Sequence, residues 1–171
     1  MAVLGERGYR PGPRAAHQPL TVIAMERNRW IVVGMDFSDG AVRALDYALE
    51  SAKTVSASVA CVHAYEDAPG TSAHHDPTAA ILQQLEEVIA QRTPGWCNVR
   101  IDPVVRRGPP WEKLANVATE LGADVIVVGA DGQRGVARKG LLGTVVSRLV
   151  TTSPRTVVVV PSDMRPYRAW G

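Results

Sequence analysis

A carboxylate follows directly after an apolar run near the start of the regular part of the chain. Residues 30–34 read WIVVG, and Met35, Asp36, Phe37 and Ser38 come next. Asp36 could accept hydrogen bonds from the hydroxyl groups of a ribose, because a carboxylate is a strong acceptor. The alternative is that Asp36 and Ser38 only form a turn and cap the next helix.

A second segment combines glycine with positive charge. Residues 129–144 read GADGQRGVARKGLLGT and contain five glycines and three basic residues. Glycine lets backbone N–H groups come close to an anion, and Gly143-Thr144 can open a helix whose first N–H groups bind phosphate. Arg134 adds charge, and Asp131 is the one candidate metal ligand. The alternative is a flexible connector with solvated basic side chains, since no Gly-Lys-Ser/Thr triplet of a Walker A loop occurs.

Apolar runs alternate with amphipathic segments from Trp30 onward, and this alternation predicts the elements that hold the two segments. Strands that are separated by helices form a parallel sheet with right-handed crossovers. The near-continuous apolar runs indicate that helices cover both faces of this sheet. We therefore expect a three-layer, doubly wound α/β fold with five parallel strands. The expected strands are 30–34, 55–64, 99–104, 124–129 and 156–160, and the expected helices are 38–52, 78–91, 109–121 and 143–152.

Ligands of open α/β sheets bind outside the carboxyl ends of the strands, where the strand order reverses. Both segments follow strands, so both belong to this edge. His63 ends an apolar run and is expected to be a satisfied, partly buried residue and not a base. We see no nucleophile paired with a base and no carboxylate pair, and therefore expect little or no catalysis.

Composition excludes several classes of function. The net charge is +2 and aromatic residues make up 5%, so neither nucleic acid nor an anionic membrane is an expected partner. No apolar stretch approaches the roughly 20 residues that span a bilayer, and the run near Val22 is too short for a signal peptide. A cytoplasmic location is expected by default. Cys61 and Cys97 are expected to be buried small hydrophobic residues, with no metal bound.

Three parts are expected along the chain. Residues 1–28 are rich in glycine and proline and lack periodicity, so we expect a mobile tail. Residues 29–162 form the α/β domain, and residues 163–171 a short second tail.

The chemistry-bearing segments together resemble the universal stress protein family, and in particular its ATP-binding subgroup. The resemblance runs from about Trp30 to Pro161 and rests on residues 35–38, Val62-His63-Ala64, Gly108-Pro109 and the pattern Gly129-x-x-Gly132 followed by Gly143-Thr144. It implies the strand order 3-2-1-4-5 and a site for ATP or AMP, with or without Mg²⁺. Adenine would lie near Met35, Ala64 and Val128, the ribose near Asp36, and the phosphates across the glycine-rich segment. The site residues so implied are Gly34, Met35, Asp36, Ala64, Val128, Gly129, Asp131, Gly132, Arg134, Gly143, Thr144 and Val145.

The implied order places residues 156–160 at an edge of the sheet. This run is apolar and carries no charge that would deter pairing, so we expect a homodimer through it. The resemblance implies the same.

One departure from the family signature keeps a second function open. Ten residues, Gln133 to Leu142, separate Gly132 from Gly143, one more than in the signature. The extra residue could leave the phosphate site intact, or it could leave a dimeric signalling module of the same fold that binds no nucleotide.

Overall fold

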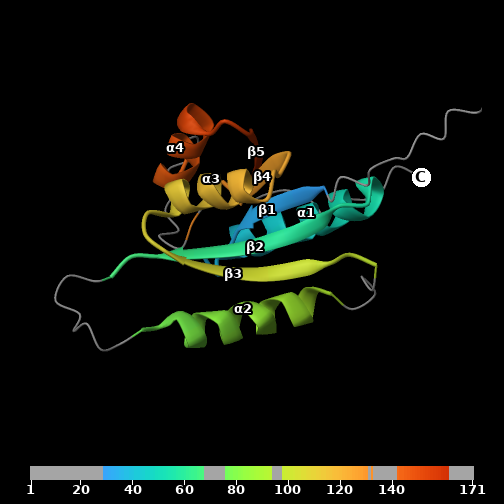
Figure 1. Cartoon of the computed structure of the whole chain (residues 1–171), viewed down its shortest axis with the longest axis horizontal. Helices are drawn as coiled ribbons and strands as arrows, with labels where there is room; N and C mark the ends of the chain where they lie inside the picture. The colour runs from blue at the N-terminus through green and yellow to red at the C-terminus, as the bar shows by residue number, and fades with distance from the viewer. Residues whose placement is uncertain (1–28, 68–75, 94–97, 131, 133–141, 162–171) are drawn as a thin grey trace, which may run out of the picture.

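The structure, a computed structural model, describes residues 29–67, 76–93, 98–130, 132 and 142–161 (Figure 1). Five strands alternate with four helices in this part of the chain. The two expected tails lie outside the described residues. The elements are β1 (Trp30–Gly34), α1 (Asp39–Val55), β2 (Ser58–Tyr65), α2 (Thr78–Arg92), β3 (Ile101–Arg107), α3 (Pro110–Glu120), β4 (Val125–Gly129), α4 (Thr144–Thr152) and β5 (Thr156–Val160).

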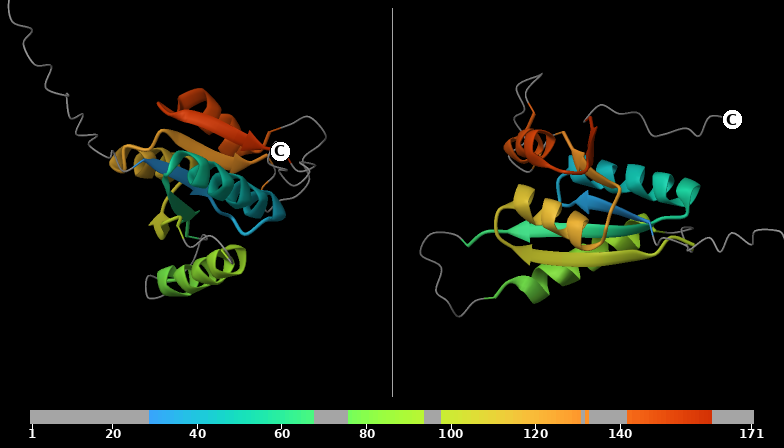
Figure 2. Two further views of the ribbon diagram at one scale, coloured as in Figure 1. Left: turned by 90° about the vertical axis from the view of Figure 1, so that its right-hand side faces the viewer. Right: turned by 45° about the horizontal axis from the view of Figure 1, so that its top comes forward.

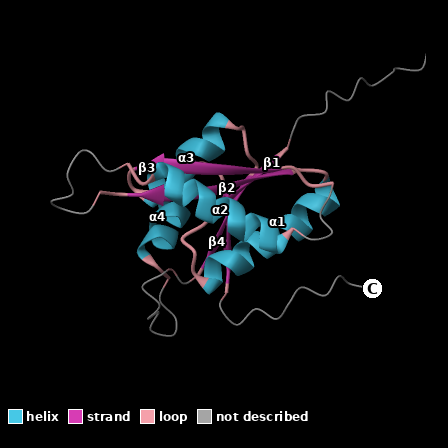
Figure 3. Cartoon of the chain, turned by 90° about the horizontal axis from the view of Figure 1, so that it is seen from below, coloured by secondary structure: helices cyan, strands magenta, loops and turns pink. Residues whose placement is uncertain are grey.

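The five strands form one parallel sheet in the order β3-β2-β1-β4-β5, which confirms the expected topology. Helices cover both faces of the sheet, α1 and α2 on one side and α3 and α4 on the other (Figures 1 and 2). Figure 3 views the sheet from the side of α2. The chain therefore has the predicted three-layer α/β architecture.

Side chains alternate between two cores along the buried strands. Ile31 and Val33 of β1 join the core under α1 and α2, whereas Trp30 and Val32 join the core under α3 and α4. Val32 and Val33 are both fully buried, because each face of this central strand is covered. The two cores fix the register of β1 and hence the place at which its last residues emerge.

The first helix is longer than the sequence predicted. Ser38 caps α1 as expected, since its hydroxyl oxygen accepts from the N–H of Ala41 at 3.2 Å. The expectation that a strand begins at Val55 was wrong: α1 continues through Val55 and ends at Ser56 in the left-handed conformation. The alternation of Val and Ser at 55–59 is typical of a strand. In the structure, however, the N–H of Ala57 donates to the carbonyl of Ala52 at 2.9 Å, a bond that belongs to the end of the helix.

The two outer strands, β3 and β5, differ in what they present to the open edge. In a strand the N–H and C=O of one residue point to the same side, and the side alternates from residue to residue. The carbonyl of Val160 accepts from the N–H of Ala130 in the loop after β4 at 2.8 Å. Val158 therefore faces β4 as well, and Val157 and Val159 direct their backbone groups to the open edge.

On β3 the same reasoning places a proline at the open edge. The carbonyl of Arg100 accepts from Val59 and the N–H of Gly108 donates to Tyr65, both at 2.8 Å, so even-numbered residues face β2. Pro103 faces outward, where its missing N–H costs no ladder hydrogen bond. The β3 edge thus carries a proline, whereas the β5 edge consists of valines whose outward-facing backbone groups pair with no other strand in the described part of the chain.

Candidate functional site

The segment that contains Asp36 begins at the carboxyl end of β1, and the glycine-rich segment begins at the carboxyl end of β4. These strands are neighbours at the centre of the sheet, with Val33 opposite Val127. The helices that follow them, α1 and α4, pack on opposite faces. The strand order reverses between β1 and β4, which is the position where open α/β sheets bind ligands.

Asp36 lies in a tight turn just beyond β1. Its Oδ1 accepts from the N–H of Ser38 at 3.0 Å and from the hydroxyl of Ser38 at 2.5 Å. Phe37, between them, has a φ of 63°, a left-handed conformation that costs a side chain of this size free energy. One carboxylate oxygen therefore serves the turn, as the structural interpretation of Asp36 predicted.

The other carboxylate oxygen faces the glycine-rich segment. A Cβ placed on Gly132 would lie 2.9 Å from Oδ2 of Asp36, so the carboxylate would have to shift to admit it. Gly132 thus brings bare backbone against the carboxylate. Two segments almost 100 residues apart in the sequence meet here, as the sequence predicted.

The end of the glycine-rich segment opens α4. Gly143 is the N-cap residue, with φ −56° and ψ 156°, and no side chain of the described residues caps this helix. The N–H of Gly143 lies 3.4 Å from the carbonyl of Ala130, which ties the helix start to the end of β4. Thr144 is exposed and Val145 half-buried. This helix end presents N–H groups and the positive end of a helix dipole.

Two predicted site residues, Asp131 and Arg134, lie outside the described residues. The other residues of 133–141 lie outside them as well. The structure therefore places Gly132 and Gly143 on either side of the lengthened spacer and describes only Leu142 of the spacer itself.

The residues expected near adenine are mostly packed into the sheet. Met35 is 3% exposed and Val128 4%. A Cβ on Gly34 would lie 3.0 Å from Val128 and 3.1 Å from Leu114, so these three residues pack tightly together. Ala64, near the end of β2, is half-buried. Met35 and Val128 thus contribute core side chains behind the site.

The backbone of Met35 is bonded on both sides to β2. Its N–H donates to the carbonyl of Val62 at 2.8 Å, and its carbonyl lies 2.8 Å from Nδ1 of His63. The His63 ring also lies 4.8 Å from the Phe37 ring, centroid to centroid. His63 is therefore a satisfied, partly buried histidine, as expected, but the group that satisfies it could not be predicted from the sequence.

Gly129 has a packing role that sequence reasoning missed. A Cβ at this position would lie 2.5 Å from the carbonyl carbon of Gly40 and 3.0 Å from the N–H nitrogen of Ala41. The start of α1 passes directly over the end of β4. Gly129 is thus required for packing, independently of any ligand.

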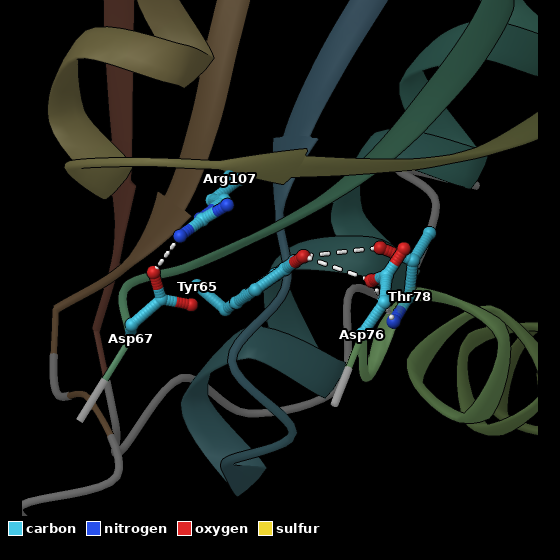
Figure 4. A network of polar contacts seen from close by, with 5 residues as sticks. All are labelled: Tyr65, Asp67, Asp76, Thr78 and Arg107. Atoms are coloured by element: carbon cyan, nitrogen blue, oxygen red, sulfur yellow. Dashed lines mark hydrogen bonds and ion pairs between the residues drawn. The ribbon is translucent and has the colours of Figure 1, made fainter. Parts of the chain in front are cut away.

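A separate polar network ties β2 and β3 to the start of α2 (Figure 4). The Tyr65 hydroxyl donates to Oδ1 of Asp76 at 3.2 Å and lies 3.1 Å from the Thr78 hydroxyl, while the Thr78 N–H donates to Asp76 at 2.9 Å. Hydrogen bonds from the Thr78 side chain first, and then from its backbone, lower the pKa of Asp76 below 3.8. Arg107 and Asp67 form an ion pair beside this network.

The described part of the chain holds neither a metal-ligand cluster nor a membrane-spanning helix. No group of three or more His, Cys, Asp or Glu side chains in this part could hold a metal ion. None of its helices combines the length and apolar character needed to cross a membrane.

The chain belongs to the universal stress protein family, whose model matches residues 27–161. A universal stress protein of Mycobacterium tuberculosis (strain ATCC 25618 / H37Rv) is 30% identical over 161 residues, covering 88% of this chain and 53% of that protein. The chain thus spans about half the length of the first curated relatives it matches. A second universal stress protein of the same strain is 33% identical over 147 residues, covering 80% of this chain and 98% of that protein.

Solved structures of the family share the fold. Universal stress protein UspA from Lactobacillus plantarum superimposes with a TM-score of 0.64 at 23% identity, over 78% of this chain and 98% of that chain. A universal stress protein in complex with cAMP superimposes with a TM-score of 0.56 at 29% identity, over 77% of this chain and 96% of that one.

Proposed function

We propose that this chain binds an adenine nucleotide, ATP or AMP, at the carboxyl ends of β1 and β4 and acts as a regulatory protein with little or no catalysis. The proposal rests on the close approach of Gly132 to the Asp36 carboxylate, where a Cβ on Gly132 would lie 2.9 Å from Oδ2. It joins an acceptor suited to ribose hydroxyls to a segment suited to phosphate.

The described residues fit such a ligand in chemistry and placement. Asp36 would accept from the ribose, and Gly132 leaves space that a Cβ would fill. The start of α4, at Gly143, Thr144 and Val145, would provide backbone N–H groups and a dipole for phosphate. Gly34 and Ala64 would border the base, with Met35 and Val128 packed behind them and Gly129 holding α1 in place.

The family adds support for the class of ligand. The relative with cAMP bound is 29% identical to this chain, and cAMP contains adenine, ribose and one phosphate. We extend the proposal to ATP because of the glycine-rich segment. With ATP, Mg²⁺ would need ligands from the phosphates, joined by Asp131, the metal ligand predicted from the sequence, which lies outside the described residues.

Titration calorimetry of the purified chain with ATP and with AMP, with and without Mg²⁺, tests the proposal. Asp36→Ala should weaken binding by about 1–3 kcal/mol, because ribose hydroxyls lose a charged acceptor. Asp39→Ala, an exposed carboxylate in the first turn of α1, serves as the control and should bind like the wild type. Equal affinity of the wild type and Asp36→Ala would remove Asp36 from the site.

We also propose that two copies pair through β5. The edge positions Val157 and Val159 carry apolar side chains and outward-facing backbone groups, whereas the opposite edge carries Pro103. An apolar edge strand of this kind favours pairing with another strand. A second copy of the chain is the occupant that the symmetry of homo-oligomers favours. The cytoplasmic location remains a prediction.

A dimeric module without nucleotide is the second candidate, favoured by the extra residue between Gly132 and Gly143. It predicts neither heat of binding nor a thermal shift at millimolar ATP or AMP, with the dimer intact. Binding of either nucleotide would exclude it.

A further inference from the structure

His63 occupies a position from which it fixes the turn that carries Asp36. Its Nδ1 lies 2.8 Å from the carbonyl oxygen of Met35. A carbonyl can only accept, so Nδ1 carries the proton and donates it to the Met35 oxygen. The bond holds the residue immediately before Asp36.

The same ring contacts the residue immediately after Asp36. The His63 and Phe37 rings lie 4.8 Å apart, tilted by 34°. Phe37 has a φ of 63°, which a bulky residue keeps only when its surroundings hold it there. One side chain of β2 therefore supports the backbone on both sides of the carboxylate.

Other hydrogen bonds hold the turn together with this support. The Met35 N–H is bonded to Val62 at 2.8 Å, so β2 fixes residue 35 at two points. Beyond Phe37, Oδ1 of Asp36 accepts from Ser38, and Oδ2 faces Gly132. A shift of residues 35–37 would change the direction of Oδ2 toward the glycine-rich segment.

We propose that His63 is a positioning residue: it holds the Asp36 carboxylate in the direction that binds ribose, through Met35 on one side and Phe37 on the other. This inference rests on the proposed nucleotide site. His63 itself makes no contact with the nucleotide in this account, and its effect on affinity passes through Asp36.

The test compares His63→Leu with His63→Asn. Leucine keeps apolar bulk but removes the donor, whereas the side-chain amide of asparagine can take the place of Nδ1–H. We expect His63→Leu to weaken binding of ATP and AMP about 5- to 20-fold and His63→Asn to stay within about threefold of the wild type, by the usual worth of a hydrogen bond. In the Asp36→Ala background, His63→Leu should have little further effect, because the group that it positions is gone.

A second measurement needs no nucleotide. Amide hydrogen exchange at Ser38, whose N–H donates to Asp36, should be faster in His63→Leu than in the wild type and should recover in His63→Asn. Equal affinity loss in both variants, additive losses with Asp36→Ala, or unchanged exchange at Ser38 would each overturn the inference. Absence of nucleotide binding by the wild type would instead overturn the proposed function, and the exchange comparison would still decide whether His63 positions Asp36.

Discussion

Gly129 at the end of β4 lies directly against Gly40 at the start of α1: a Cβ on Gly129 would come within 2.5 Å of the Gly40 carbonyl carbon and 2.7 Å of its oxygen. Both partners are backbone, so neither can move aside without shifting a helix or a strand. Gly129→Ala should therefore destabilise the fold by about 3 kcal/mol, the upper range for overpacking, and lower Tm by about 10 °C. Thermal unfolding followed by circular dichroism measures this, and a Tm within about 2 °C of the wild type would contradict it.

Gly132→Ala is the matched comparison for Gly129→Ala, because the atom that the new Cβ would crowd is at the end of a side chain. Gly132→Ala would press on Oδ2 of Asp36 and not on backbone. We expect a change of less than about 1 kcal/mol in the free energy of unfolding, together with an affinity for ATP or AMP about tenfold weaker. Calorimetric titration and thermal unfolding separate the two effects. Full affinity in Gly132→Ala would mean that the contact with Asp36 does not matter for binding.

The two edges of the sheet predict which strand pairs with a second copy. In a symmetric dimer, Val159→Pro removes one N–H from the open edge of β5 in each of the two copies. Dimer affinity should therefore fall about 30-fold, with the monomer still folded. Val158→Pro removes an N–H that faces β4 and should lower Tm instead. Sedimentation velocity across a concentration series measures the first effect and thermal unfolding the second. A dimer that tolerates Val159→Pro as well as the wild type would exclude the β5 edge.

Cys61 should be inert in the folded protein. It is fully buried in β2 as a free cysteine, and burial raises the pKa of its thiol from 9.0 to about 12. The thiolate is therefore about a thousandfold less populated at pH 8 than for an unperturbed thiol. A folded-state pKa raised in this way stabilises the fold below about pH 9, and this contribution is lost as the pH rises toward 12.

Reaction with a chromogenic disulfide reagent in a Cys97→Ser background measures the reactivity of Cys61 alone. We expect no reaction over an hour at pH 8 in buffer and complete reaction in denaturant. Rapid labelling of the folded protein would show that β2 opens readily, contrary to its place in the core.

Asp76 should titrate at lower pH than an ordinary aspartate. The hydrogen bonds from Thr78 lower its pKa below 3.8, so this contact stabilises the start of α2 at neutral pH and is lost as the pH falls through the folded-state value. Thr78→Val should return the pKa toward 3.8, whereas Thr78→Ser should leave it lowered. Carboxyl carbon chemical shifts measured across pH 2–6, a range on the order of two units around the ordinary value, report all three. A wild-type midpoint at or above 3.8 would be inconsistent with the network in Figure 4.

The architecture and the meeting of the two segments were predictable from the sequence. Buried strands such as 125–129 and amphipathic helices have strong periodic signals, and the parallel order follows from their alternation. The position of Asp36 beside Gly132 followed from the strand order that the family resemblance implies, together with the rule that ligands bind where strand order reverses.

Other features could not be predicted because they depend on contacts between distant elements. The bond from His63 to Met35 joins residues that are 28 apart, and neither residue type signals the other. The packing role of Gly129 depends on where α1 crosses β4, which no local pattern encodes. The helix end at Ser56 was missed because alternating Val and Ser satisfy the strand pattern as well as a final helical turn.

A crystal structure of the protein grown with ATP tests the nucleotide site most directly. We expect density for the nucleotide between Asp36 and Thr144, with the ribose hydroxyls bonded to the Asp36 carboxylate and the phosphates at the start of α4. Nucleotide bound elsewhere, or a cleft filled by residues 133–141 with no nucleotide at saturating ATP, would contradict it.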